Sequence, residues 1–487
     1  MLHLYKYHCS VSTFLFTYGC AATSQIQKTM ARPSSSPFSV RQGKPELLPP
    51  AKPTPRELKQ LSDIDDQKGL QFQFPVMMFY ENKSIPGTER NDPVRVIQEA
   101  IAETLVFYYP LAGRLIEIEP NRLAVDCTGE GILFVEADAD VSFGQLGGAI
   151  QPPCPYMNEF LCDDPAYGGI TYSPLLLVQI TRLSCGGFVF AIRLNHVISD
   201  GSGLVQFLKA VAEIAQGSSE PSLLPVWERE LLNARHPPKI TCAHHAYENL
   251  SNHNSRLVSM ASNNMAHQSF FFGHTEKRAL LKHLPPRLQS YSTFDVLTAS
   301  LWRCWAISMA PNPEEIVCLC FPTSVRGKNG VRLPSGYYGN AFVLASAISE
   351  AGKLCRNPVA YALELVKKAK AQVNEEFIRS SADCIVMKGR RSFSTPWSFV
   401  VTDTTRAGFT EVDFGWGTPV YGGPAGSQSP INLYVKFKNN EGEWGILVPV
   451  YLPAAAMQRF KEEIWRMTQQ PPDDSLCNHP TDSTSKL

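Results

Sequence analysis

A histidine and an aspartate lie four residues apart between a strand-like and a helix-like pattern. Residues 188–194 are apolar and partly β-branched with one Arg, which predicts a buried strand, and from Leu204 the apolar residues recur at helical spacing. His196 therefore lies at the end of the strand, and Asp200 lies at the start of the helix. An imidazole titrates near neutral pH and can accept a proton from a hydroxyl group, so we interpret His196 as a general base.

Asp200 has two interpretations. It precedes Gly-Ser-Gly at the start of a helix, so it can cap the helix or hold a neighbouring Arg and thereby orient His196. Direct contact with the substrate is the alternative, and we favour the capping role. The motif alone is weak evidence, because chance produces one His-x-x-x-Asp spacing in such a chain about half of the time.

Other catalytic motifs are missing from the sequence. It contains no Gly-x-Ser-x-Gly, no Gly-x-x-x-x-Gly-Lys-Ser/Thr and no His-Glu-x-x-His, which disfavours a serine hydrolase, a P-loop enzyme and a zinc protease of that type. The 13 cysteines form no Cys-x-x-Cys pair. The tightest spacing, Cys318-Leu-Cys320, places both thiols on one face of a strand, so we expect reduced core cysteines and no metal site.

Length and charge limit the choice of partners. A chain of 487 residues predicts two domains of about 200 residues each. The 45 basic residues balance the 45 acidic ones, which gives no electrostatic reason to expect nucleic acid or a membrane surface as a partner. No apolar run has the length needed to span a bilayer.

A second motif, Asp413-Phe-Gly-Trp-Gly417, lies over 200 residues after the first. Together the two motifs resemble the paired signatures of the plant BAHD acyltransferases, which transfer an acyl group from coenzyme A to an alcohol or amine. Condensation domains and carnitine acyltransferases share only the first motif. The resemblance covers about residues 36–470. It implies a two-domain α/β fold related to chloramphenicol acetyltransferase, in which each domain is a mixed sheet flanked by helices and an active-site channel lies at the interface.

The chemistry that the resemblance implies needs few groups. His196 deprotonates the alcohol, the alkoxide attacks the thioester, and the tetrahedral oxyanion collapses with release of the coenzyme A thiolate. Acyl-CoA is then a co-substrate, and no permanently bound cofactor, metal or covalent intermediate is needed. We expect a monomer whose partners are acyl-CoA and a small alcohol.

The second motif has a supporting role in this family. There the Asp pairs with an Arg and supports the solvent channel, so we assign Asp413 that role, with direct chemistry as the alternative. Trp416 is either part of the core or a lining residue of the channel, where its indole N–H could donate to the oxyanion.

A third region resembles the family's coenzyme A site. It comprises Arg326 and the segment Tyr337-Tyr338-Gly339-Asn340-Ala341, where Gly339 would let the backbone approach the pantetheine arm. Ordinary packing is the alternative for the two tyrosines. The chain departs from the pattern at Ser324, where the family commonly has Asn. The basic residues 388–391 could reach the 3′-phosphate of coenzyme A, although we favour a solvated loop there.

The elements around these motifs follow from hydrophobic spacing. We predict a strand at 71–80, a helix at 93–108, a hairpin at 114–137, strands at 175–182 and 187–194, and a helix at 203–216. A crossover over 217–240 leads to a strand at 269–273, helices at 275–283 and 293–305, and a strand at 316–323. A helix at 358–377, a strand at 397–402, a hairpin at 431–450 and a helix at 453–467 complete the second half.

These elements group into domains. We predict an N-terminal domain over 30–216, a linker over 217–245, a C-terminal domain over 246–470 and a flexible tail over 471–487. Residues 1–29 contain no acidic residue, and Met30-Ala-Arg-Pro resembles the start of such acyltransferases. We therefore expect an N-terminal extension that reflects a mis-assigned start, with a transit segment as the alternative.

Local sequence narrows the resemblance further. Residues 401–409, Tyr421-Gly-Gly-Pro-Ala425 and Ala341 are similar to the alcohol acyltransferase branch, especially to the enzymes that transfer benzoyl groups from benzoyl-CoA to benzyl alcohol. That reaction is the expectation. Alternatives are an alcohol acyltransferase that uses acetyl-CoA or a hydroxycinnamoyl-CoA, a non-catalytic CoA-binding paralogue, and an acyl-CoA hydrolase.

The last three residues, Ser485-Lys-Leu487, match a peroxisomal import signal. We expect binding to the peroxisomal import receptor and a peroxisomal location, with a cytoplasmic location as the alternative.

Overall fold

The computed structural model describes residues 38–82, 92–163, 169–248, 264–390, 397–426 and 431–469. The predicted extension 1–29, the tail 471–487 with its peroxisomal signal, and Arg391 lie outside the described residues. In the described ranges, no helix has both the length and the apolar character needed to cross a bilayer.

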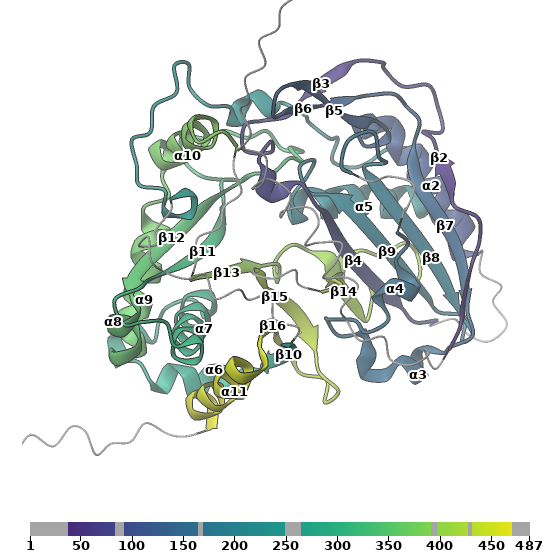
Figure 1. Cartoon of the computed structure of the whole chain (residues 1–487). Helices are drawn as coiled ribbons and strands as arrows, with labels where there is room; N and C mark the ends of the chain where they lie inside the picture. The colour runs from purple at the N-terminus through teal and green to yellow at the C-terminus, as the bar shows by residue number, and fades with distance from the viewer. Residues whose placement is uncertain are drawn as a thin grey trace, which may run out of the picture.

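The first half of the chain builds a mixed seven-stranded sheet in the order β1-β7-β8-β9-β4-β14, with β2 paired to β7 (Figure 1). Its strands are β1 (Val40–Gln42), β2 (Glu46–Leu48), β4 (Gln73–Tyr80), β7 (Ile132–Ala139), β8 (Leu176–Leu183), β9 (Phe188–Asn195) and β14 (Tyr421–Pro424). Only β7 and β8 run parallel; the other neighbours are antiparallel. The helices α2 (Pro93–Phe107) and α5 (Gly201–Ala215) pack against each other beside this sheet. Their buried apolar residues share one core with β4, β8 and β9.

The second half builds a mixed six-stranded sheet in the order β10-β16-β15-β13-β11-β12. Its strands are β10 (Met265–Phe272), β11 (Ile316–Ser324), β12 (Phe342–Glu350), β13 (Ser398–Asp403), β15 (Ile431–Lys438) and β16 (Trp444–Pro453). The helices are α6 (His274–Lys282), α7 (Thr293–Met309), α8 (Ala351–Arg356), α9 (Val359–Ala371), α10 (Glu375–Met387) and α11 (Ala454–Gln469). The central helix α7 is buried along most of its length and packs against α9 and α11 (Figure 1). The predicted architecture of two mixed sheets flanked by helices is therefore confirmed.

Strand β14 lies in the sequence of the second half but pairs with β4 of the first sheet. Residues Phe409, Val412, Phe414 and Trp416 just before it also belong to the core of the first half. The segment from Phe409 to Pro424, which belongs to the second half of the sequence, thus packs into the first half of the structure. The domain boundaries drawn from the sequence did not include this exchange.

A small three-stranded sheet covers the start of the first half. It consists of β3 (Leu58–Gln60), β5 (Arg114–Glu119) and β6 (Arg122–Asp126) in the order β3-β6-β5. The predicted hairpin 114–137 is correct only up to residue 126, since β7 leaves to join the large sheet. Gly131 allows this change of direction, because its φ is +99° and a Cβ there would lie 2.2 Å from the Leu48 carbonyl oxygen.

The predicted helix 358–377 is also wrong as a single element. α9 ends at Ala371, and α10 begins at Glu375 after Asn374, whose side chain accepts a hydrogen bond from the Phe377 N–H at 2.9 Å. This N-cap starts a new helix although the apolar spacing continues across the break. The strand β12 and the helix α8 were not predicted from the sequence. The other predicted strands and helices are present, with ends shifted by a few residues.

Candidate active site

His196 follows β9 directly, where the strand pairs with β4. Its backbone N–H donates to the Phe72 carbonyl oxygen at 2.8 Å, so the sheet pairing extends by one residue beyond the strand. The next residues turn within the protein, and α5 begins at Gly201. The predicted arrangement of strand, short loop and helix is therefore correct, and it holds the His196 backbone rigidly at the edge of the first sheet.

Asp200 holds three parts of the structure together. One carboxylate oxygen accepts from the Gly203 N–H at 2.9 Å and caps α5. The carboxylate also pairs with Arg326, with nitrogen to oxygen distances of 2.6 and 3.1 Å, and accepts from the Ala341 N–H at 3.0 Å. The sequence predicted the cap and the arginine partner, and both are confirmed. Asp200 thus fixes the loop that carries His196 to the second half of the protein.

The Arg326 guanidinium is hydrogen-bonded to other groups of the protein. Besides Asp200, it donates to the Gly339 carbonyl oxygen at 2.8 Å. These contacts tie the end of β11 to the segment that precedes β12. They give Arg326 a structural position next to the His196 loop, while its predicted contact with coenzyme A stays a prediction.

Asn340 contacts His196 directly, a role that the sequence did not indicate. Its Oδ1 lies 3.1 Å from His196 Nδ1, and its Nδ2 donates to the His196 carbonyl oxygen at 2.8 Å. With an amide oxygen at Nδ1, the neutral ring carries its proton there and leaves Nε2 as the acceptor. The side chain that we assigned to coenzyme A binding is fully buried and orients the predicted base.

Three aromatic rings surround the His196 ring. The centroids of Phe72, Phe74 and Phe342 lie 5.1, 5.8 and 6.4 Å from the imidazole. All three phenylalanines are half-buried. Burial lowers the pKa of His196 below its ordinary value, although the Asp200 charge and the Asn340 contact oppose the shift. The ring is therefore a neutral base at physiological pH in an apolar environment.

Tyr338 and Gly339 have packing roles. Tyr338 is buried against Tyr108, with ring centroids 5.1 Å apart, and its carbonyl oxygen accepts from the Ser199 hydroxyl at 2.5 Å. A Cβ at position 339 would lie 2.3 Å from Nη1 of Arg229. The space next to Gly339 is therefore occupied by Arg229, and not left open for a pantetheine arm as we expected from the sequence.

Asp413 organises its own loop. Its Oδ1 accepts from the N–H groups of Gly415 and Gly417, both at 2.8 Å, and its carbonyl oxygen accepts from the Gln216 side chain at 2.6 Å. Among the described residues Asp413 forms no ion pair, so the arginine partner implied by the resemblance is not found there. The nearby Trp416 is buried and meets the Phe188 ring edge-on at 5.6 Å, which agrees with a core role.

In the basic segment 388–390, Lys388 is exposed as expected, but Arg390 is not solvated. Arg390 is largely buried and pairs with Asp63 and with Asp66, the latter at 3.1 Å. Its backbone oxygen also accepts from the Lys68 N–H at 3.0 Å. Both our preferred interpretation of a solvated loop and the alternative of a phosphate ligand are therefore wrong for Arg390.

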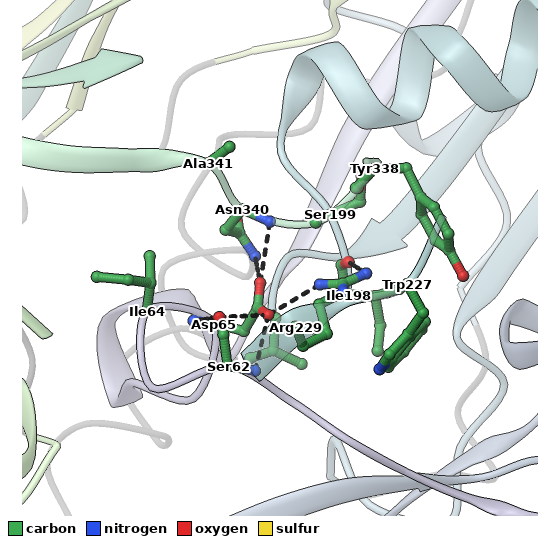
Figure 2. Close-up of polar contacts among 12 residues, drawn as sticks. Ser62, Ile64, Asp65, Ile198, Ser199, Trp227, Arg229, Tyr338, Asn340 and Ala341 are labelled. Atoms are coloured by element: carbon green, nitrogen blue, oxygen red, sulfur yellow. Dashed lines mark hydrogen bonds and ion pairs between the residues drawn. The ribbon is translucent and has the colours of Figure 1, made fainter. Parts of the chain in front are cut away.

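Two functional candidates were missed in the sequence. Asp65 and Arg229 form an ion pair at 2.8 Å with both side chains almost completely buried. Figure 2 shows this pair beside Asn340 and the backbone of Ile198. The only signal in the sequence was the density of aspartates in Ser62-Asp63-Ile64-Asp65-Asp66, a short segment to which we assigned no function.

Known proteins were compared with the chain. The Transferase family profile matches residues 38–467. The chain is 55% identical over 432 residues to a benzyl alcohol O-benzoyltransferase of Petunia hybrida, which covers 88% of this chain and 93% of the relative. It is 54% identical over 449 residues to alcohol acyl transferase 1, allele GSd, of Malus domestica, covering 91% of this chain and 97% of the relative. The crystal structure of vinorine synthase shares the fold, with a TM-score of 0.67 at 22% identity over 88% of this chain and 98% of that one.

Proposed function

Because the chain belongs to the Transferase family and is an acyltransferase of its CoA-dependent, alcohol-acylating kind, we propose that its reaction is benzoyl transfer from benzoyl-CoA to benzyl alcohol. The products are benzyl benzoate and free coenzyme A. Acyl-CoA is a co-substrate that leaves in every turnover.

We assign the base in this reaction to His196. Nε2 takes the proton from the alcohol hydroxyl while the alkoxide oxygen attacks the thioester carbonyl carbon. The new C–O bond produces a tetrahedral oxyanion, which collapses as the C–S bond breaks. The thiolate then takes the proton back from the imidazolium, so the neutral base is restored. The Asn340 oxygen at Nδ1 stabilises the imidazolium that forms between the two proton transfers.

The aromatic residues around His196 are our reason for proposing aromatic substrates. Phe72, Phe74 and Phe342 place three rings within 5.1 to 6.4 Å of the imidazole, and each is half-buried. An aromatic ring bound beside them gains stacking or edge contacts in addition to the burial of its surface. A benzoyl or benzyl group therefore gains more here than an acetyl group does. The benzoyltransferase relatives support the same substrates.

A second candidate is an alcohol acyltransferase that prefers acetyl-CoA or another acyl donor. The apple relatives named as alcohol acyl transferases reach 54% identity, close to the 55% of the benzoyltransferases, so identity alone does not separate the two activities.

Competition between donors tests the proposal. The purified full chain is assayed with benzoyl-CoA, acetyl-CoA and a hydroxycinnamoyl-CoA, each with benzyl alcohol, with 1-hexanol and without alcohol, and the esters are identified by mass spectrometry. We expect the highest kcat/KM with benzoyl-CoA and benzyl alcohol. A higher kcat/KM with acetyl-CoA supports the second candidate. Thiol release without alcohol indicates an acyl-CoA hydrolase, and no release with any pair indicates a non-catalytic CoA-binding protein.

A further inference from the structure

Asp65 lies at a point where three distant segments of the chain meet. It comes from the segment before β4, while Arg229 comes from the connection between the halves and Asn340 from the segment before β12. Figure 2 shows both carboxylate oxygens of Asp65 in use, one toward Asn340 and one toward Arg229 and Ser62. The side chain is completely buried, so water does not compete for these contacts.

The contacts of Asp65 decide which end of the Asn340 amide faces His196. Asp65 Oδ1 accepts from the Asn340 backbone N–H at 2.9 Å and from its Nδ2 at 2.8 Å. A carboxylate that is ionised can only accept, so it requires the NH₂ group at that end. The His196 carbonyl oxygen, 2.8 Å from Nδ2, favours the same orientation. The amide oxygen must then point at Nδ1 of the imidazole.

We propose that Asp65 is a positioning residue that selects the catalytic tautomer of His196 through Asn340. With the amide oxygen at 3.1 Å, the ring nitrogen Nδ1 carries the proton and Nε2 stays free to accept one from the alcohol. Asp65 itself touches neither the imidazole nor the substrate. This inference rests on the proposed function only for the effect on turnover, because the tautomer can be measured directly.

Arg229 is the charged partner of the Asp65 carboxylate. Its Nη1 lies 2.8 Å from Asp65 Oδ2, and its Nη2 donates to the Ile198 carbonyl oxygen at 2.8 Å, two residues after His196. The guanidinium also lies over the Trp227 ring at 4.2 Å. Asp200, in the loop that follows His196, pairs with Arg326 in the same way, so both of these carboxylates have a guanidinium partner.

The substitution Asp65→Asn inverts the selection with almost no change in shape. Oδ2 of Asp65 accepts from three donors, namely Arg229 Nη1, the Ser62 N–H and the Ser62 hydroxyl, so the oxygen of the new amide stays at that end. Its NH₂ group then faces the NH₂ group and the backbone N–H of Asn340, so donors meet donors at that end. This repulsion opposes the one bond that remains, from Nδ2 to the His196 carbonyl oxygen, and the Asn340 amide turns to present its oxygen to residue 65. The Asn340 NH₂ group now donates to Nδ1, and the ring proton moves to Nε2, where it blocks the base.

The experiment reads the tautomer and the turnover separately. The ¹⁵N and ¹³C shifts of the His196 ring are measured in the wild-type protein and in Asp65→Asn, and are assigned by difference against His196→Gln. Turnover is measured as alcohol-dependent thiol release from benzoyl-CoA. Asp66→Asn is the matched control, because Asp66 is also buried in the same segment but bonds to Arg390 and the Leu123 N–H. The double variant Asp65→Asn with Asn340→Asp restores an acceptor at Nδ1 and keeps one buried carboxylate.

We expect an Nδ1-protonated ring in the wild type and in Asp66→Asn, and an Nε2-protonated ring in Asp65→Asn. The kcat of Asp65→Asn should fall about 100-fold or more with KM within about threefold, since general base catalysis is worth about 10²–10⁴-fold. The double variant should recover at least about tenfold of the loss. A wild-type ring protonated at Nε2 overturns the proposal even if Asp65→Asn does not fold, and so does an unchanged tautomer in a folded Asp65→Asn. A wild-type chain without turnover refutes the proposed function alone, because the ring shifts still report the tautomer.

Discussion

Removal of the Asp200 side chain separates a structural role from a chemical one. In Asp200→Ala, α5 loses its cap, the Ala341 N–H loses its acceptor and Arg326 loses its ionic partner. In Asp200→Asn the amide oxygen keeps the cap, but the charge is lost and the amide NH₂ group faces the Ala341 N–H, which loses its acceptor. We therefore expect a larger loss of stability for the alanine variant than for the asparagine variant.

The magnitude follows from these three contacts. Loss of an N-cap costs about 1 kcal/mol, and a buried N–H without an acceptor costs about 1–2 kcal/mol. Breaking a buried ion pair costs about 3–5 kcal/mol, but the Arg326 side chain is 28% exposed and can be hydrated in part, so about 1–2 kcal/mol applies here. The free energy of unfolding should fall by about 3–5 kcal/mol in Asp200→Ala and by about 2–4 kcal/mol in Asp200→Asn, which keeps only the cap.

Urea unfolding followed by tryptophan fluorescence measures the stability of both variants, and thiol release measures their activity. We expect activity to follow stability, so that Asp200→Asn keeps most of its turnover. The reasoning is refuted if Asp200→Ala unfolds within about 1 kcal/mol of the wild type while turnover falls more than about 100-fold. That result would place Asp200 in the chemistry itself.

Four further predictions follow from the structure. Burial lowers the pKa of His196 below its ordinary 6.5, and the neutral ring is the base, so turnover should fall only below pH 6.5 as the pH is lowered; an acidic limb of the kcat profile at or above pH 7 would contradict this. Burial also lowers the pKa of His244 and His267 to about 4, so the unfolded state binds more protons than the folded state between pH 6.5 and 4. The free energy of unfolding measured in urea should therefore fall as the pH is lowered through that window. In Gly203→Ala a Cβ would lie 2.1 Å from the Tyr338 carbonyl oxygen, so the free energy of unfolding measured in urea should fall by about 1–3 kcal/mol. In the control Gly201→Ala the Cβ would meet no atom closer than 3.8 Å, so its free energy of unfolding should stay within about 0.5 kcal/mol of the wild type. In Phe74→Leu the kcat/KM for benzoyl-CoA should fall about 3- to 10-fold more than that for acetyl-CoA, since an aromatic contact is worth about 0.5–1.5 kcal/mol; equal losses for both donors would remove Phe74 from acyl selection.

The local part of the site could be predicted from the sequence because it depends on neighbouring residues. The strand before His196 and the helix after Asp200 follow from short-range spacing, and an aspartate at a helix start is a strong cap signal. The Asp200 contact with Arg326 was predicted as a pair with an unnamed arginine. In contrast, the helix break at 372–374 was missed, because Val366, Ala369, Val373 and Phe377 continue the apolar spacing across it.

The polar network behind His196 could not be read from the sequence. Asp65 and Asn340 are 275 positions apart, and Asp65 and Arg229 are 164 positions apart. Hydrophobic periodicity carries no information on which polar side chains meet after folding. Buried ionisable groups are rare unless they are paired, so an aspartate-rich segment such as Ser62–Asp66 gives no sign from its sequence that one of its carboxylates is buried. The exchange of β14 into the first sheet was missed for the same reason, since its partner β4 lies over 340 positions earlier.

The most direct test of the account is alcohol-dependent thiol release by the full chain beside His196→Ala. With benzoyl-CoA and benzyl alcohol, the account predicts release in the wild type and a fall of about 10²–10⁴-fold in the variant, with unchanged circular dichroism. Release that persists at the wild-type rate in a folded His196→Ala would contradict the assignment of His196 as the base.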